Sequence, residues 1–123
     1  MQKLINWFDI PTSNFDRAVK FYQNVLRVTL KIVDCEDSKM GCFPNDEYNI
    51  TGCIFYSENY KPSKDGVIIS FFSQDDLNNI LKRVEANGGK TITPKTKIMA
   101  ERRGYFALFS DSEGNKMGVY SDN

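Results

Sequence analysis

The lack of histidine limits the chemistry that this chain can perform. The 123-residue sequence contains no histidine. It therefore lacks the Ser-His and Cys-His pairs of nucleophilic enzymes and the imidazole ligands usual for zinc and non-haem iron. Its three cysteines, Cys35, Cys42 and Cys53, show no CxxC spacing. We expect reduced, mostly buried thiols, with a disulfide between Cys35 and Cys42 across a hairpin as the alternative.

Carboxylates are the remaining candidates for acid–base or metal chemistry. Asp9 follows Trp7 at strand spacing, so the two side chains should share one face. Asp9 could act as a general base, or it could be a hydrogen-bonded structural residue. Together with Glu58 and Glu101 it could offer an all-oxygen site for Mg²⁺ or Ca²⁺. The alternative is that both glutamates are solvated loop charges.

A pair of arginines, Arg102 and Arg103, precedes Gly104. Such a pair could clamp a carboxylate or phosphate group of a ligand. The alternative is a solvated run of charge.

The chain contains an internal repeat. Residues 5–26 have the pattern of a strand, a turn and an amphipathic helix, and residues 67–89 repeat it after a shift of 62 positions. The shift places Phe15 on Leu77 and Tyr22 on Val84. Oxygens in the run Thr12-Ser13-Asn14 should cap the first helix, and Asp75 or Asp76 the second.

Three strands should follow each helix, at residues 28–33, 38–43 and 50–57 and at residues 90–93, 105–110 and 116–121. The prediction is an α+β fold of two βαβββ modules, which form a curved, mostly antiparallel sheet with a concave cup. We expect one domain over residues 1–123, with module one at 1–59, a linker at 60–66 and module two at 67–123.

Composition excludes several classes of partner. Basic and acidic residues balance at 16 each, which gives no electrostatic reason to expect nucleic acid. No apolar run approaches the roughly 20 residues that span a bilayer. The first residues lack the apolar core of a signal peptide. We therefore expect a cytoplasmic protein.

Three motifs in this order resemble the vicinal oxygen chelate superfamily, which includes glyoxalase I, bleomycin-resistance proteins and extradiol dioxygenases. The stretch 15–22, FDRAVKFY, is similar to the family's D-L-x-R-A-x-x-F-Y. The stretch 111–115, DSEGN, is similar to its D-P-x-G-N hairpin, and the stretch 75–89 is similar to its second helix. The resemblance implies paired βαβββ modules, a cup that holds the active site and a homodimer.

The resemblance also implies metal ligands, His or Glu, at four strand positions of the cup. Matching the motifs places these positions at Trp7, Gly52, Ile69 and Gly118. None of these side chains coordinates a metal, so we expect the family fold without its metal centre and without a cofactor.

Alternation along the strands predicts which side chains point into the cup. The predicted ligand-binding residues are Trp7, Asp9, Ile54, Tyr56, Ile69, Phe71, Lys116 and Tyr120, and Ile5 shares their parity. Trp7 is either an apolar platform for a flat molecule or a residue that fills space.

The sequence leaves three functions open. The first is a metal-free protein that binds a small, partly apolar molecule. The second is a lyase, isomerase or dioxygenase-like enzyme that uses Asp9, a tyrosine or an unrecognised metal. The third is a partner-binding protein with a vestigial cup.

Overall fold

The chain forms two compact units, Met1–Pro62 and Ser63–Asn123. The computed structural model describes residues 4–45, 51–99 and 104–123. The division between the units falls inside the stretch 60–66 that the sequence predicts as a linker. Among the described residues, no helix is long and apolar enough to cross a membrane.

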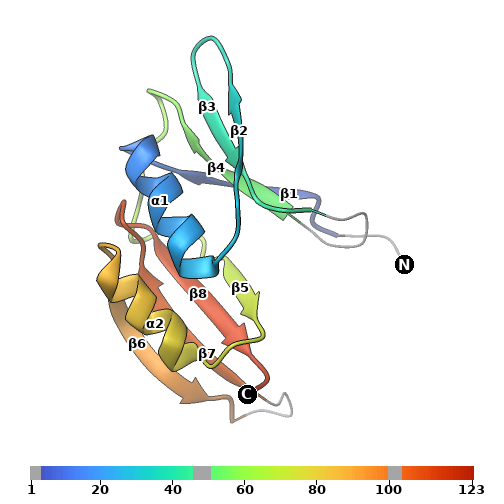
Figure 1. Cartoon of the computed structure of the whole chain (residues 1–123), viewed down its shortest axis with the longest axis vertical. Coiled ribbons are helices and arrows are strands. Elements are labelled where there is room, and N and C mark those ends of the chain that lie inside the picture. The colour runs from blue at the N-terminus through green and yellow to red at the C-terminus, as the bar shows by residue number, and fades with distance from the viewer. Residues whose placement is uncertain (1–3, 46–50, 100–103) are drawn as a thin grey trace. The chain divides into compact units, whose positions relative to one another are not determined.

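Each unit contains one helix and one four-stranded mixed sheet (Figure 1). The elements of the first unit are β1 (Trp7–Pro11), α1 (Phe15–Leu26), β2 (Lys31–Asp34), β3 (Lys39–Cys42) and β4 (Thr51–Tyr56). Those of the second are β5 (Ser70–Ser73), α2 (Leu77–Ala86), β6 (Lys90–Lys97), β7 (Tyr105–Ser110) and β8 (Lys116–Ser121). The sheet orders are β1-β4-β3-β2 and β5-β8-β7-β6. The predicted α+β class and repeated βαβββ order are confirmed.

The two helices begin at equivalent positions. Asn14 caps α1, because its side chain accepts a hydrogen bond from the backbone N–H of Arg17 at 3.1 Å. Asp76 caps α2 by accepting one from the N–H of Asn78 at 2.9 Å. A short side-chain oxygen there satisfies a backbone donor that the first helical turn leaves unpaired. The predicted shift of 62 positions relates these two caps.

The core of the first unit lies between α1 and its sheet. Phe15, Ala18, Phe21, Tyr22 and Val25 recur at helical spacing and are buried. Val19 and Leu26 are only partly buried, so they lie at the margin of this face.

Strands β1 and β4 and the residue after β3 supply the other side of this core. The rings of Tyr22 and Phe43 meet edge to face with centroids 5.7 Å apart. Ile54 on β4 and Ile10 on β1 are both fully buried. Burial of these side chains on one face holds the helix to the sheet and leaves the opposite face open.

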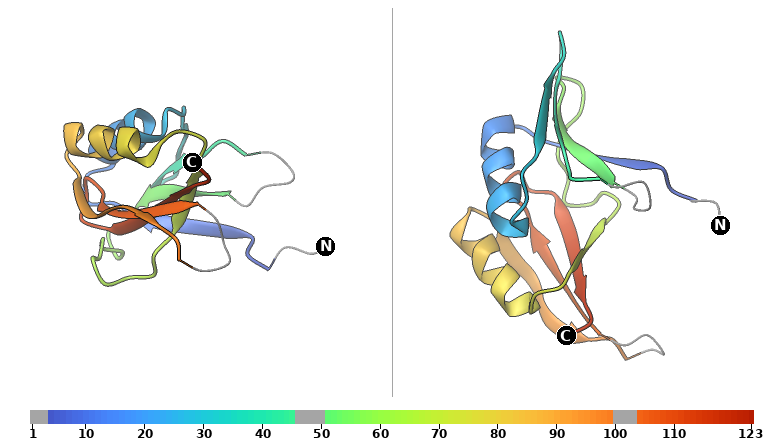
Figure 2. Two further views of the ribbon diagram at one scale, coloured as in Figure 1. Left: turned by 90° about the horizontal axis from the view of Figure 1, so that it is seen from below. Right: turned by 45° about the vertical axis from the view of Figure 1, so that its right-hand side comes forward.

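The core of the second unit is built in the same way. Figure 2 shows α2 on one face of its sheet, where it contacts β6, β7 and β8. The helix buries Leu77 and Val84, and the strands bury Phe109, Met117 and Val119. Gly88 ends the helix with a left-handed φ of 96°, and the N–H of Gly89 donates to the Val84 carbonyl at 2.9 Å.

Three strand boundaries differ from the sequence prediction by three or more residues. β2 begins at Lys31 rather than at residue 28. Arg27 adopts a left-handed conformation, and the Leu30 N–H donates to Gln23 Oε1 at 3.0 Å, so this segment stays out of the sheet. β5 begins at Ser70 rather than at Val67. β6 continues through Pro94 to Lys97, and two register shifts accommodate the proline.

The loop between β7 and β8 is held by one buried carboxylate. Asp111 Oδ1 accepts hydrogen bonds from the N–H groups of Glu113, at 2.8 Å, and Asn115, at 2.9 Å. Its Oδ2 accepts another from Asn115 Nδ2 at 3.1 Å. Gly114 supplies the positive φ of 95° that the turn requires. Asn115 in turn accepts a hydrogen bond from the N–H of Ser63 at 3.0 Å.

Tyr22→Asp should unfold the first unit. Tyr22 is fully buried, and a carboxylate there would be desolvated without a charged partner on the helix face. We expect a loss of at least about 4 kcal/mol, which is comparable with the whole stability of a small domain. Circular dichroism during thermal melting measures the change. Tyr22→Phe is the control, and a Tyr22→Asp protein that melts close to wild type would contradict the helix assignment.

Asp111→Ala should destabilise the second unit by about 2–3 kcal/mol, because it leaves buried donors without an acceptor. Urea unfolding measures the change. Asp65→Ala, which removes an exposed aspartate, should be near neutral. Equal stability of the two variants would show that the Asp111 contacts contribute nothing.

Candidate functional site

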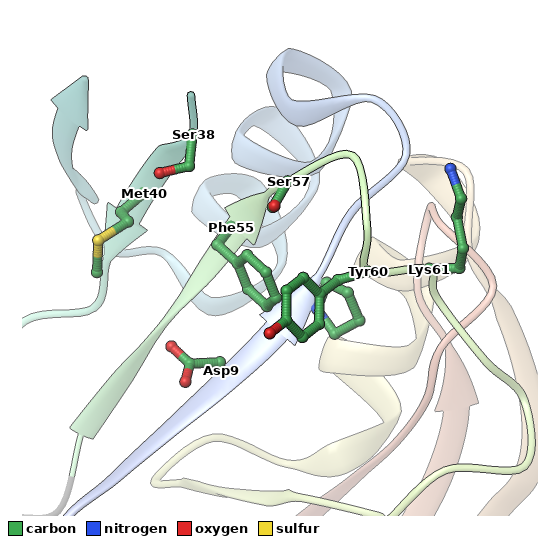
Figure 3. Close-up of a pocket in the computed structure, with 8 residues that line it drawn as sticks. Asp9, Ser38, Met40, Phe55, Ser57, Tyr60 and Lys61 are labelled. Atoms are coloured by element: carbon green, nitrogen blue, oxygen red, sulfur yellow. The ribbon is translucent and has the colours of Figure 1, made fainter. Parts of the chain in front are cut away.

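The open face of the first sheet carries a pocket. β1 pairs in parallel with β4, which places Asp9 opposite Cys53 and Pro11 opposite Phe55. Antiparallel pairing of β3 with β4 then places Met40 opposite Phe55. A pocket of about 500 Å³ opens over this face (Figure 3). It is lined by Asp9, Pro11, Ser38, Met40, Phe55, Ser57, Tyr60 and Lys61.

Two aromatic rings form one wall of the pocket. Tyr60 and Phe55 meet nearly edge to face, with ring centroids 5.3 Å apart. A turn positions Tyr60, since its N–H donates to the Ser57 carbonyl at 3.1 Å. In Figure 3 the Tyr60 hydroxyl lies on the side of its ring that faces Asp9. The wall is therefore apolar, with one hydroxyl at its edge.

Asp9 is the carboxylate of this pocket, and two neighbours hold it in place. Its Oδ1 accepts hydrogen bonds from Trp7 Nε1 at 2.9 Å and from Cys53 Sγ at 3.2 Å. The indole comes from the same strand two residues earlier, and the thiol comes from the paired strand. Both donors approach one oxygen, so they fix the orientation of the carboxylate.

Cys53 is a structural thiol rather than a nucleophile. Burial is the main cause that raises its pKa to about 12, and the hydrogen bond to the nearby negative charge of Asp9 raises it further. The group therefore stays protonated at neutral pH and can donate to Asp9. Cys42 lies directly opposite on β3. All three cysteines are free, and Cys35 pairs through its backbone with Ser38 rather than facing Cys42.

The side chains of β1 point to the sides of the sheet that the sequence predicts, whereas those of β4 point to the opposite sides. Trp7 and Asp9 contact each other on the open side. Ile54 was expected beside them, but it is fully buried against α1, where it approaches Gly41 next to Leu30 and Phe15. Because the register pairs Trp7 with Thr51, the odd-numbered residues of β4 face the pocket and the even-numbered ones face the helix.

Tyr56 follows the same inverted parity. Its side chain lies on the α1 side, in a depression of about 320 Å³ that also contacts Ser13, Asn14, Phe15, Asp16 and Lys39. The placement of Tyr56 and Ile54 beside Asp9 was therefore wrong, because a strand offset by one residue exchanges its two faces.

A similar offset affects β5 in the second unit. Ile69 precedes the strand, although its carbonyl accepts the Gly118 N–H at 2.9 Å. Phe71 pairs with Val119, which is buried on the α2 side. Phe72 instead shares the open face with Tyr120, at 6.0 Å between ring centroids. The expectation that Ile69 and Phe71 lie with Tyr120 was therefore wrong.

Lys116 and Tyr120 do lie on the open face of the second sheet. They alternate with Met117 and Val119, which are buried against α2. Whether any of the predicted residues binds a ligand stays a prediction.

Sequence reasoning missed most of the pocket lining. Met40, Phe55, Tyr60 and Lys61 were not among the candidates. Tyr60 and Lys61 were assigned to the linker, and correct parity on β4 would have found Phe55. Of the charged candidates, Glu58 is exposed, and Glu101, Arg102 and Arg103 lie outside the described residues.

Comparison with protein families agrees with this architecture. The model of the Glyoxalase/Bleomycin resistance protein/Dioxygenase superfamily matches residues 4–119. The chain therefore belongs to that superfamily. No match is found among curated protein sequences.

Solved structures show the same fold at low sequence identity. A glyoxylase/bleomycin resistance protein/dioxygenase domain from Frankia sp. EAN1pec aligns with a TM-score of 0.75 and 12% identity over 100% of both chains. TnmS3, an antibiotic-binding protein from Streptomyces sp. CB03234, aligns with a TM-score of 0.74 and 15% identity over 99% of this chain and 98% of that one. A glyoxalase I mutant from Zea mays aligns at 0.74 and 15% identity over 95% of this chain, which spans only 45% of the maize chain.

The residues present do not fit the metal centre that the resemblance implies. The structure pairs Trp7 with Thr51, whereas Gly52 faces Phe8 on the helix side, so the match to Gly52 was off by one residue. Gly118 lies against Ser70, and a Cβ there would force the Ser70 Oγ to move. Within the described part of the chain, no group of three His, Cys, Asp or Glu residues could hold an ion. These residues therefore give no basis for metal-dependent chemistry at these positions.

The three thiols should differ sharply in reactivity. At neutral pH, brief alkylation of the native protein should label Cys35, which is exposed, and spare Cys53, which is fully buried. Peptide mass spectrometry measures the labelling, and the urea-unfolded protein should label at all three sites. Rapid native labelling of Cys53 would contradict the burial and hydrogen bonding described above.

Cys53 should also make stability depend on alkaline pH. The pKa of this thiol is about 12 when folded against an ordinary 9.0, so the unfolded chain loses the proton first. Its contribution to the free energy of unfolding should be complete below pH 9 and should fall as the pH rises toward 12. Urea unfolding of wild type and Cys53→Ala across that range measures the difference, and parallel curves would contradict the raised pKa.

Proposed function

We propose that this protein binds a small, partly apolar molecule on the open face of the first sheet and does so without the family's metal centre. The observation that carries the proposal is the pocket of about 500 Å³ with an aromatic wall and one oriented carboxylate. Binding sites for small molecules commonly combine a mostly apolar lining with a few placed polar groups.

The lining supports binding more than catalysis. Phe55, Met40, Pro11 and Tyr60 offer apolar surface, and Ser38 and Ser57 offer hydroxyls. Cys53 is protonated and buried, and Asp9 has no second carboxylate beside it among the residues that line the pocket. A mechanism that uses a pair of carboxylates therefore lacks its second group in this lining.

Similarity to a binding protein gives further support. TnmS3 is described as an antibiotic-binding protein, and its fold matches nearly the whole of this chain. At 15% identity this likeness is evidence for a shared fold, and a shared binding role is part of our proposal.

The competing enzyme function is tested by metal analysis. Purified protein should contain no stoichiometric zinc, nickel or iron by mass spectrometry, and added metal should not raise its melting temperature. Tightly bound metal at one equivalent would overturn the metal-free proposal and favour the lyase, isomerase or dioxygenase-like alternative.

We also propose that the chain is a cytoplasmic homodimer, as the family resemblance and the composition lead us to expect. Light scattering coupled to size-exclusion chromatography tests the dimer, and a monomeric mass across micromolar concentrations would overturn it.

Trp7→Ala should weaken ligand binding more than it lowers stability. The change removes an indole beside the pocket and one of the two donors that orient Asp9, and Trp7 is 38% exposed, so it adds little to the core. We expect a loss of about tenfold in affinity for a ligand found by thermal-shift screening, with a melting shift of only a few degrees.

Calorimetry measures the affinity, and Trp7→Phe separates the ring from the N–H donor. A large fall in melting temperature with unchanged affinity would show that Trp7 only fills space.

A further inference from the structure

We propose that Asp9 makes the pocket selective for organic cations that carry an aromatic or apolar group. This inference rests on the proposed function and names the class of ligand. A protonated amine would meet the carboxylate, and the apolar group would lie against the wall formed by Tyr60 and Phe55.

The Asp9 carboxylate is prepared to accept a donor. Trp7 and Cys53 both donate to Oδ1, so they hold the group without occupying Oδ2. Among the described residues, the ion pairs involve Asp75 and Asp76 rather than Asp9. A carboxylate that is oriented but not neutralised can form a short, charge-assisted hydrogen bond with an ammonium or guanidinium group.

Among the described residues, Lys61 is the only lysine that lines the pocket, and it does not neutralise Asp9. Figure 3 shows the Lys61 side chain directed away from the carboxylate, beyond the Tyr60 ring. Lys39 belongs to the depression on the other side of the sheet, with Tyr56. The charge that a ligand meets on the β1 side of the pocket is therefore negative.

The aromatic wall favours the same class of ligand. Tyr60 is 59% exposed, so its ring is available to a ligand beside Phe55. Aromatic faces attract cations, and an edge-to-face pair provides an apolar surface for a ring or chain attached to the amine. A carboxylate and an exposed aromatic ring in one pocket both select against an anionic ligand.

A matched series of probes tests the inference. The probes are 4-phenylbutylamine, 4-phenylbutanol and 4-phenylbutyrate, which share a phenyl ring on a four-carbon chain and differ in charge. Trp7 is the sole tryptophan, so its indole N–H gives one NMR signal next to Asp9. Titration with each probe should shift this signal. We expect the amine to bind about tenfold more tightly than the alcohol, and the butyrate to bind most weakly.

Asp9→Asn keeps the shape and the acceptor oxygen but removes the charge. In this variant the amine and the alcohol should bind within about twofold of each other. Asp65→Asn removes an exposed aspartate of the second unit and should keep the full preference for the amine.

Two outcomes would overturn the inference. If the alcohol binds wild type as tightly as the amine, or if Asp9→Asn retains the preference, Asp9 does not select cations, although the pocket still binds small molecules. If none of the three probes shifts the Trp7 signal or binds by calorimetry, both this inference and the proposed binding function fail.

Discussion

The parallel pairing of β1 with β4 is the constraint on which the candidate site depends. Thr12 fixes the end of this pairing, because its N–H and its hydroxyl both donate to the Phe55 carbonyl at 2.9 Å. The register brings Asp9 to Cys53 and turns Ile54 toward α1. A slip of one residue would bury the carboxylate side of the strand and expose its apolar side, so the hydrophobic core and the pocket require the same register.

The two units share their topology but differ in what their open faces present. In the first unit the open face holds a carboxylate, a protonated thiol and the aromatic pair of Phe55 and Tyr60. In the second it holds Ser70, Phe72 and Tyr120, with Gly118 packed against the Ser70 side chain. The repeat therefore preserves caps and core spacing, which the fold requires, and varies the exposed residues, which it does not.

Desolvation explains why the two acidic groups of the first open face, Asp9 and Cys53, do not compete as charges. Burial holds Cys53 in its neutral form, and the neutral thiol is a donor to Asp9 instead of a competing charge. Trp7 supplies the second donor from a partly exposed position. The carboxylate thus keeps a fixed direction, which the ligand selectivity that we propose requires.

The sequence alone predicts the repeated βαβββ order, both helices with the short polar runs that cap them, and the strands at residues 105–110 and 116–121, because hydrophobic period and capping chemistry are local. It also placed Trp7 and Asp9 together, since they lie two residues apart on one strand. Which residues of β4 and β5 join them depends on how the strands pair in the folded sheets. Strand register depends on a partner distant in sequence, and an error of one residue exchanges the faces, as Ile54 and Phe71 show.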